Sequence, residues 1–170
     1  MINVVLYNPE IPQNTGNIMR TCVAANVKLH LIEPLGFSLD EKSVRRSGAS
    51  YVIKTNYVTY KSWEDFTNKN KGSFYFSTRY GSHTPSEFDF SVSTEEIYLI
   101  FGAESSGIPK EILKPHLDNC IRLPMTKDVR SLNLSNVVAI MVYEVLRQQN
   151  YNDLYFDEPE ELKGKDYILS

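Results

Sequence analysis

Three short segments of this sequence bring glycines together with amide, carboxylate and guanidinium side chains, the groups that hydrogen-bond to polar ligands. The first segment covers residues 8–20 and contains Asn14, Gly16 and Arg20 around a turn that two prolines stiffen. Amide and guanidinium N–H groups donate hydrogen bonds to phosphate and ribose oxygens. A capped turn with a solvated arginine would give the same spacing, but the density of donors favours a ligand site.

The second segment, residues 101–109, contains Gly102, Glu104 and Gly107. Glycines five positions apart let the backbone turn sharply and pass close to a ligand. The segment does not match a Rossmann glycine loop, a Walker A loop or the Gly-x-Ser-x-Gly pattern of a nucleophile elbow, so dinucleotide-binding, nucleotide-hydrolysing and hydrolase functions are disfavoured. Between the two glycines, Glu104 contacts a ligand, braces the loop, or is a solvated acid.

The third segment comprises residues 121–125 and 130–136, where a predicted strand end is followed by the start of a helix. Four hydrogen-bonding side chains stand in the first turns of this otherwise apolar helix: Ser131, Asn133, Ser135 and Asn136. One such residue is explained as a helix cap, but four exceed what capping requires. Backbone amides at a strand end and a helix start are suited to hold an adenine or a carboxylate.

Alternating strands and helices would position these segments. Short apolar or alternating runs predict strands, at residues 2–7, 28–32, 74–77, 97–101 and 120–123. Helical spacing predicts helices at 13–25 and about 132–149, the second capped by Ser131. This order is typical of an α/β fold with a mostly parallel sheet flanked by helices. Since ligands of such sheets bind beyond the carboxyl ends of the strands, the expected site lies in the loops after Tyr7, Ser77, Phe101 and Leu123.

The last predicted helix is apolar on every side, because residues 137–142 are six consecutive apolar residues. A helix of this kind must be covered all round. One face can pack on the sheet, and a second copy of the chain is the simplest cover for the rest. We therefore expect a homodimer rather than a monomer.

The composition is that of a globular protein of about one domain. The chain has 170 residues, 42% hydrophobic and 23% charged, which excludes collagen-like and largely disordered classes. Its net charge of −3 is unevenly spread, because residues 151–170 hold six acids against two lysines, a balance of −4 that leaves the rest at +1. We expect a folded domain over 1–150 and an acidic, mobile C-terminal extension over 151–170.

Targeting and metal-binding signals are absent from the sequence pattern. No apolar run approaches the roughly 18 residues that cross a bilayer, and the N-terminal residues do not resemble a signal peptide, so we expect a cytoplasmic protein. Cys22 and Cys120 lie far apart and are expected to be buried hydrophobes rather than a disulfide. The three histidines are scattered, so no metal site is expected.

The three segments, taken in order, resemble the three motifs of the SPOUT superfamily of RNA 2′-O-methyltransferases. Residues 6–17 and 143–148 are similar to those of its small single-domain branch, which methylates the wobble nucleotide (position 34) in the anticodon stem-loop of tRNA. The resemblance covers residues 1 to about 150. It implies S-adenosyl-L-methionine as cofactor and a C-terminal trefoil knot, which the pattern of elements does not suggest. It also implies a homodimer joined through the knot region and the C-terminal helix, with active sites at the subunit interface.

The resemblance also assigns roles to individual residues. It places the cofactor against Ser77, Thr78, Gly102, Glu104, Gly107, Leu123, Met125, Ser131, Leu132 and Asn133. Arg20 and Asn14 would lie at the reacting ribose as catalytic residues, and Ser135 and Asn136 complete the third motif. Arg20 is the family's proposed base, but a guanidinium stays protonated up to about pH 12. We therefore assign Arg20 to ribose and phosphate binding and to stabilising developing charge.

Arginines near these segments are candidates for contact with RNA phosphates. Lys42, Arg45 and Arg46 fall on one side of a helical spacing, which is typical either of a solvated helix face or of a phosphate contact. Arg79 and Arg130 lie beside the predicted ligand loops. A local basic surface would let a nearly neutral domain bind RNA, with modest affinity and a shallow salt dependence.

Two other functions stay open on the sequence alone. A ribosomal RNA 2′-O-methyltransferase would share the fold and the cofactor, although such enzymes often carry an extra RNA-binding domain that this sequence does not show. A knotted dimer without cofactor would be a non-catalytic RNA-binding protein, although the intact glycine loop and the polar residues of 131–136 speak against it.

Overall fold

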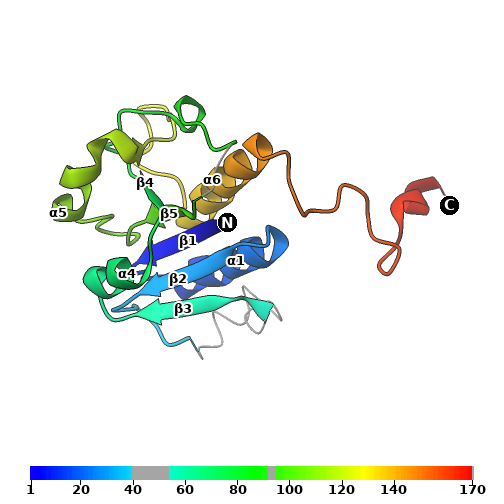
Figure 1. The fold of residues 1–170 in the computed structure, drawn as a ribbon, viewed down its shortest axis with the longest axis horizontal. Coiled ribbons are helices and arrows are strands. Elements are labelled where there is room, and N and C mark those ends of the chain that lie inside the picture. The colour runs from blue at the N-terminus through cyan, green and yellow to red at the C-terminus, as the bar shows by residue number, and fades with distance from the viewer. Residues whose placement is uncertain (40–53, 92–94, 170) are drawn as a thin grey trace.

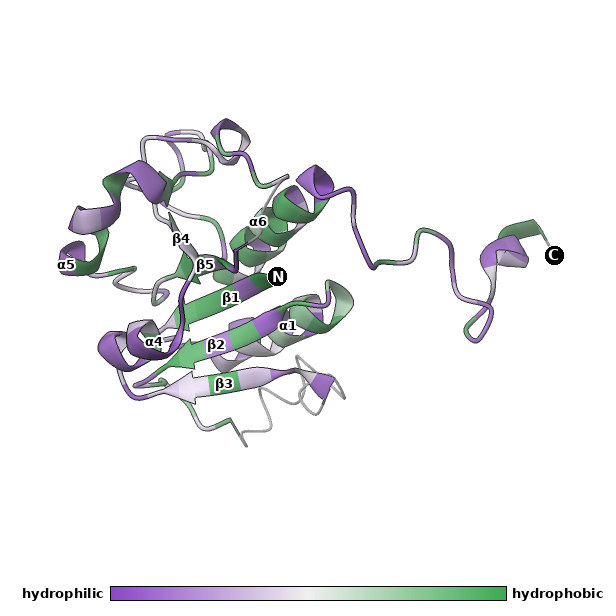
Figure 2. Ribbon diagram, viewed as in Figure 1, coloured by the Kyte–Doolittle hydropathy of each residue, from purple (hydrophilic) through white to green (hydrophobic). Residues whose placement is uncertain are grey.

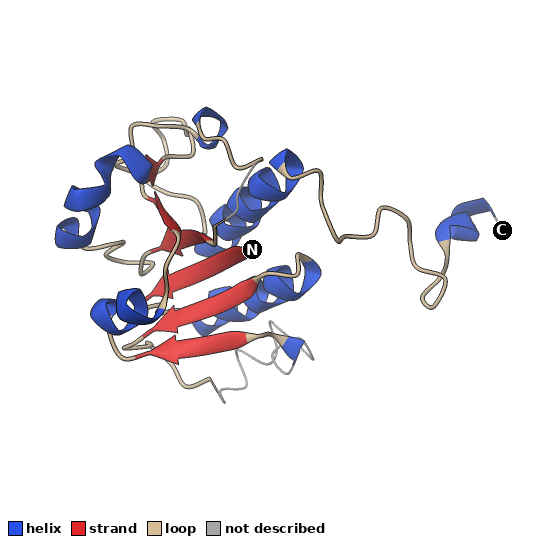
Figure 3. Ribbon diagram, viewed as in Figure 1, coloured by secondary structure: helices blue, strands red, loops and turns tan. Residues whose placement is uncertain are grey.

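Residues 1–39, 54–91 and 95–169 are described by the computed structural model, so the basic cluster that includes Arg45 and Arg46 lies outside the described residues. These parts of the chain form one sheet of six parallel strands (Figure 1, Figure 3). The strands are β1 (Ile2–Tyr7), β2 (Lys28–Ile32), β3 (Tyr57–Tyr60), β4 (Ser73–Ser77), β5 (Ile97–Phe101) and β6 (Cys120–Ile121). Their order across the sheet is β3-β2-β1-β5-β4-β6. The predicted α/β class with a mostly parallel sheet is confirmed.

Helices cover both faces of this sheet. Helix α1 (Pro12–Ala24) and helix α6 (Leu134–Gln148) pack on one face, and the short helices α4 (Trp63–Lys69) and α5 (Lys110–Leu113) pack on the other. Helices α1 and α6 contact each other; α1 lies behind β2, and α6 lies against β1 and β5 (Figure 1). Three 3₁₀ helices complete the described elements, at Pro85–Glu87, Lys114–Asn119 and Lys165–Leu169.

The central strands form because their residues are apolar on both faces. Every residue of β5, with the sequence IYLIF, is buried, and β1 is buried over residues 2–6. Figure 2 shows the hydrophobic ribbon that results along β1. Alternate residues point to opposite faces, so Val4 and Leu6 pack under α1 and α6 while Val5 packs under α4 and α5. Strands covered on both sides by helices are expected to show such nearly continuous apolar runs.

The predicted cap of the last helix is wrong. Helix α6 begins at Leu134, not Leu132, and its cap is Asn133 rather than Ser131. The Asn133 side-chain oxygen accepts a hydrogen bond from the Ser135 backbone N–H at 2.9 Å, which satisfies a donor at the helix start. Serine and asparagine are both good helix caps, so residue type does not distinguish Ser131 from Asn133. Asn133 also donates a hydrogen bond to Asn14, which fixes its position at the helix start.

The predicted strand at 120–123 is also too long, because only Cys120 and Ile121 pair with β4. Strand β3 and helices α4 and α5 were not predicted. Strand β3 lies at the edge of the sheet, and its first three residues are exposed. A four-residue edge strand with one buried side chain carries too weak a pattern to identify.

Helix α6 buries one face and leaves another exposed. Its buried side chains are Val138, Met141, Val142, Val145 and Leu146. On the other side Ile140 is 45% exposed and Tyr143 is 43% exposed. The six-residue apolar run indicates that α6 should be covered on all sides. In the single chain, however, the face that carries Ile140 and Tyr143 is not covered.

After α6 the chain leaves the body of the protein (Figure 1). Tyr151 and Leu154 still pack against the main core, whereas Tyr155 and Phe156 are exposed. Among the described residues, no helix is both long enough and apolar enough to span a membrane. Cys22 and Cys120 are free and buried, as expected, and burial raises the pKa of Cys22 to about 12.

A buried polar cluster lies within the sheet, on the side of α4. His30 on β2 is 1% exposed, and its ring nitrogens lie 2.9 Å from the Tyr60 hydroxyl and 3.1 Å from Asn3 Oδ1. Aromatic rings surround the imidazole. Burial, and to a smaller extent the charge of Lys28, lower the pKa of His30 to about 4. His30 is therefore neutral at pH 7, and His30, Asn3 and Tyr60, here called the His30 cluster, are parts of the core.

Candidate active site

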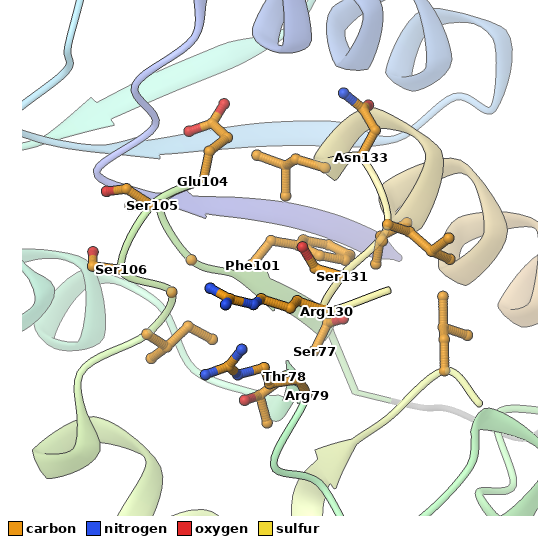
Figure 4. A pocket seen from close by; sticks show the side chains of 18 of the residues that line it. Ser77, Thr78, Arg79, Phe101, Glu104, Ser105, Ser106, Arg130, Ser131 and Asn133 are labelled. Carbon is orange, nitrogen blue, oxygen red and sulfur yellow. The ribbon is translucent and has the colours of Figure 1, made fainter. Parts of the chain in front are cut away.

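A cavity of about 600 Å³ opens at the carboxyl ends of β1, β5, β4 and β6 (Figure 4). Its walls come from the start of α1, the loops after β4 and β5, and the chain between β6 and α6. These are the four loops that the sequence pattern predicted as the site. They meet because the four strands are neighbours in the sheet and all run in the same direction.

All ten residues that the resemblance assigned to the cofactor line this cavity: Ser77, Thr78, Gly102, Glu104, Gly107, Leu123, Met125, Ser131, Leu132 and Asn133. Asn14, Arg79 and Arg130 line it as well. Arg20, Ser135 and Asn136 do not; Arg20 is exposed on α1, and the other two follow Asn133 in the first turn of α6. The structure thus brings thirteen of the predicted residues to one cavity.

The glycine loop after β5 folds back on itself. The Gly107 backbone N–H donates to the Ala103 carbonyl at 2.8 Å, and Gly107 has a φ of +71°. A Cβ on Gly102 would lie 2.1 Å from the Gly107 carbonyl carbon. Both glycines are therefore required by the tight loop, which leaves its backbone exposed to the cavity.

Glu104 is a brace between two loops rather than a solvated acid. Its carboxylate accepts hydrogen bonds from the backbone N–H groups of Glu10 at 2.8 Å and Ile11 at 3.2 Å, and from Asn14 Nδ2 at 2.9 Å. Ile11 is the N-terminal cap residue of α1 and has no capping side chain of its own. Glu104 therefore satisfies the N–H of the cap residue Ile11, and its negative charge near the helix N-terminus favours the helix.

Glu10 forms a second connection between the first loop and the glycine loop. Its carboxylate accepts hydrogen bonds from the Ser105 backbone N–H at 2.8 Å and from the Ser105 hydroxyl at 2.6 Å. These bonds, the hydroxyl first, hold the pKa of the Glu10 carboxyl below its usual value. Neither Glu10 nor Ser105 was predicted from the sequence, although each stands beside residues that were. The two loops are thus joined by a reciprocal pair of carboxylates.

Asn14 extends the brace to the third motif. Asn133 Nδ2 donates to Asn14 Oδ1 at 2.9 Å, and Asn133 Oδ1 accepts from the Ser135 hydroxyl at 2.6 Å as well as from its N–H. Asn14 is only 5% exposed. Glu104, Asn14, Asn133 and Ser135, here called the Glu104 chain, therefore connect all three sequence motifs by side-chain hydrogen bonds.

The opposite wall of the cavity is cationic. Figure 4 shows Glu104 and Asn133 on one side, and Arg79 and Arg130 extending into the cavity from the other. Arg79 donates to the Tyr80 hydroxyl at 2.5 Å, and among the described residues neither arginine has a carboxylate partner. The described residues also contain no group of three or more His, Cys, Asp or Glu side chains suited to a metal ion.

Known proteins match this chain over most of its length. The model of the SpoU rRNA Methylase family matches residues 1–143. A protein of Bacillus subtilis (strain 168) named "Putative tRNA (cytidine(34)-2'-O)-methyltransferase" is 53% identical over 154 residues, which are 90% of this chain and 96% of that protein.

Solved structures agree with this match. One, described as "Structural insights into the 2-OH methylation of C/U34 on tRNA", has a TM-score of 0.81 and 37% identity, and covers 88% of this chain and 97% of its own. An AdoMet-bound rRNA methyltransferase from Sinorhizobium meliloti has a TM-score of 0.76 and 25% identity, and covers 86% of this chain and 56% of its own. The resemblance seen in the sequence is confirmed: this chain belongs to the SpoU rRNA Methylase family.

Proposed function

We propose that this protein transfers a methyl group from S-adenosylmethionine to the ribose 2′-hydroxyl of the wobble nucleotide, position 34, of tRNA. The observation that carries the proposal is the Glu104 chain, which joins the three motifs around one cavity at the carboxyl edge of the sheet. The 53% identity to a relative named for this reaction supports the same target.

The cavity fits the proposed cofactor in size and chemistry. A volume of about 600 Å³ is in the range of small-molecule sites. The glycine loop exposes backbone groups to it, and Leu123, Met125 and Leu132 supply apolar surface for an adenine. S-adenosylmethionine would supply both the methyl group and the leaving group, so the protein has to orient the two substrates and exclude water.

Arg20 and Asn14 are proposed to act at the ribose. Arg20 would bind an RNA phosphate or ribose oxygen and stabilise negative charge that develops on the 2′-oxygen. Asn14 would hold the first loop at the cavity through its hydrogen bonds with Glu104 and Asn133. Ser135 and Asn136 stand at the start of α6, where we propose that they complete the ribose side of the site.

The role of Arg20 can be tested separately from cofactor binding. Arg20→Ala should lower kcat by about 100-fold or more, as expected when a charge-stabilising group is removed. The affinity for S-adenosylmethionine, measured by calorimetry, should stay close to that of the unchanged protein. A strong loss of cofactor affinity in this variant would contradict the assignment.

The proposal includes a homodimer and a trefoil knot. The exposed side chains Ile140 and Tyr143 on α6 support an interface with a second copy. A knot is supported by the path of the chain, which reaches β6 at one edge of the sheet and returns to place α6 against β1 and β5. Sedimentation measurements on the unchanged protein and on Ile140→Asp should give a dimer and a monomer, respectively.

The remaining parts of the proposal concern RNA contacts, domain limits and location. Arg79 and Arg130 are proposed to meet RNA phosphates at the cationic wall. Residues 1–150 would form the methyltransferase domain, with 151–170 as an acidic extension, which the end of the family match at residue 143 supports. We also propose that the protein acts in the cytoplasm, where tRNA substrates are available.

One experiment tests the reaction directly. The protein is incubated with total tRNA and with ribosomal RNA in the presence of labelled S-adenosylmethionine, and the methylated nucleotide is mapped. The label is expected on the ribose of nucleotide 34 of tRNA. A label on ribosomal RNA, on a base or at another tRNA position would contradict the proposal, and no label with tight RNA binding would favour a non-catalytic protein.

A further inference from the structure

We propose that Tyr80 is a stacking platform for a nucleobase that neighbours the methylated nucleotide. This inference rests on the proposed function, in which RNA is the substrate. Tyr80 lines the cavity and yet is 73% exposed, so its ring lies at the rim. Unpaired bases of RNA stack on exposed aromatic side chains, and this contact tolerates different bases because each has a flat face.

The turn that carries Tyr80 is fixed before any ligand arrives. The Tyr80 N–H donates to Thr78 Oγ1 at 3.3 Å, and the Gly81 N–H donates to the Thr78 carbonyl at 3.2 Å. Arg122 donates through its guanidinium to the Arg79 carbonyl. A Cβ on Gly81 would lie 2.7 Å from the Cys120 carbonyl oxygen, so the turn lies directly against β6. A platform ordered in advance loses little conformational entropy on binding.

Arg79 orients the ring and places a positive charge beside it. The Arg79 Cζ lies 4.8 Å from the centre of the Tyr80 ring, and its Nη2 donates to the Tyr80 hydroxyl at 2.5 Å. Because Tyr80 stays 73% exposed, most of the ring remains available to a base. The guanidinium is then close enough to meet the phosphate of the stacked nucleotide.

The surroundings of Tyr80 favour a nucleic acid over an apolar partner. Its cationic neighbours are Arg79 in the same turn and Arg130 on the same cavity. An aromatic ring among arginines is typical of sites for single-stranded nucleic acid, whereas exposed Tyr155 and Phe156 in the C-terminal extension are accompanied by acids. Because Tyr80 lies at the rim of the cavity proposed for the reaction, we assign the stacked base to a neighbour of the methylated nucleotide in the RNA.

The test uses the full-length protein and an anticodon stem-loop RNA that carries 2-aminopurine at nucleotide 33 or 35. Stacking on an aromatic ring quenches the fluorescence of this base. The variants are Tyr80→Ala, which removes the ring, Tyr80→Phe, which keeps the ring without its hydroxyl, and Tyr155→Ala, which removes an exposed ring outside the cavity. RNA affinity, KM and kcat, cofactor affinity and the melting temperature are measured for each.

Tyr80→Ala should bind the RNA about 5- to 100-fold more weakly, the range for losing one stacked base. It should raise KM more than it lowers kcat, lose the quenching at one of the two positions, and keep the cofactor affinity and melting temperature. Tyr155→Ala should behave like the unchanged protein. Tyr80→Phe keeps the ring but loses the hydroxyl bond to Arg79, so its RNA affinity and quenching should fall far less than those of Tyr80→Ala.

Two results would overturn the platform. Unchanged RNA affinity and quenching in Tyr80→Ala would show that no base stacks there. An equal loss in Tyr80→Phe would show that only the hydroxyl bond to Arg79 matters. Quenching by the unchanged protein without methylation of nucleotide 34 would contradict the proposed function and leave the platform standing.

Discussion

Two polar clusters of this protein use similar side chains in different settings. The His30 cluster joins residues of β1, β2 and β3 inside the sheet and is closed off by aromatic rings. The Glu104 chain joins loops and helix starts at the carboxyl edge and opens on a cavity of about 600 Å³. The first satisfies its polar groups within regular structure, whereas the second joins three segments that are distant in the sequence. We therefore expect the first to affect stability and the second to affect activity.

The largest effect is expected from breaking the Glu104 chain. Glu104→Ala leaves the N–H groups of Glu10 and Ile11 and the amide of Asn14 without their acceptor. Since each lost charged hydrogen bond costs roughly 1–3 kcal/mol, kcat/KM for methyl transfer should fall by about 100-fold or more. Glu111→Ala, an exposed acid on α5, is the control and should keep full activity. Equal activity of the two variants would contradict a bracing role.

The next effect concerns stability alone. His30→Leu removes the partner of the Asn3 side-chain oxygen and the nearer of two partners of the Tyr60 hydroxyl, which also donates to Asn70 Oδ1 at 3.5 Å. The free energy of unfolding, measured with urea, should fall by about 2 kcal/mol because two buried polar groups lose a hydrogen bond. The kcat at 25 °C should not change. If His30→Leu loses activity while keeping its stability, the assignment of stability to the His30 cluster and of activity to the Glu104 chain is wrong.

A pH series sharpens the same comparison. The pKa of His30 is lowered from its usual value near 6.5 to about 4 in the fold, so the unfolded chain binds the proton first as the pH falls. The stability from neutral His30 is fully present above pH 6.5 and is lost towards pH 4, by at most about 1.4 kcal/mol per pH unit. The advantage in unfolding free energy of the unchanged protein over His30→Leu should therefore fall steadily from pH 7 to pH 4.5, through zero. A constant difference would mean that His30 does not titrate in this way.

The smallest effect separates two tasks of Asn133. Asn133→Ala removes the α6 cap and should lower the unfolding free energy by about 1 kcal/mol. Asn133→Ser keeps a capping oxygen but cannot reach Asn14, so it should regain the melting temperature without regaining the full kcat/KM. Thermal melts and methyl-transfer rates on the same samples distinguish the two. Full activity in the serine variant would show that capping alone is needed.

Local patterns predicted much of the fold and of the site. The strands at residues 2–7, 28–32 and 97–101 were predicted with their observed bounds, because buried strands give short apolar or alternating runs. The edge strand β3 was missed, because three of its four residues are exposed and its pattern is weak. The loops of the site were identified because parallel strands place their carboxyl ends on one edge, whatever their order.

Contacts between distant residues could not be predicted. Glu104 lies about ninety residues from Glu10, Ile11 and Asn14, and the sequence left three roles open for it. Asn133 caps α6 and also holds Asn14, so residue type alone did not separate it from Ser131 as the cap. Tyr80 was not predicted as a site residue, because an exposed tyrosine in a turn has no sequence signal of its own.

By itself, the sequence determined the class of fold, the loops that form the site and the family motifs within them. These features depend on apolar periodicity, glycine spacing and residue type, which are local properties of the chain. The tertiary structure decided which partners those residues have, because the strand order β1-β5-β4-β6 brings four distant loops together. A carboxylate or an amide can serve many partners, and only the geometry of the fold selects the one that lies within hydrogen-bonding distance.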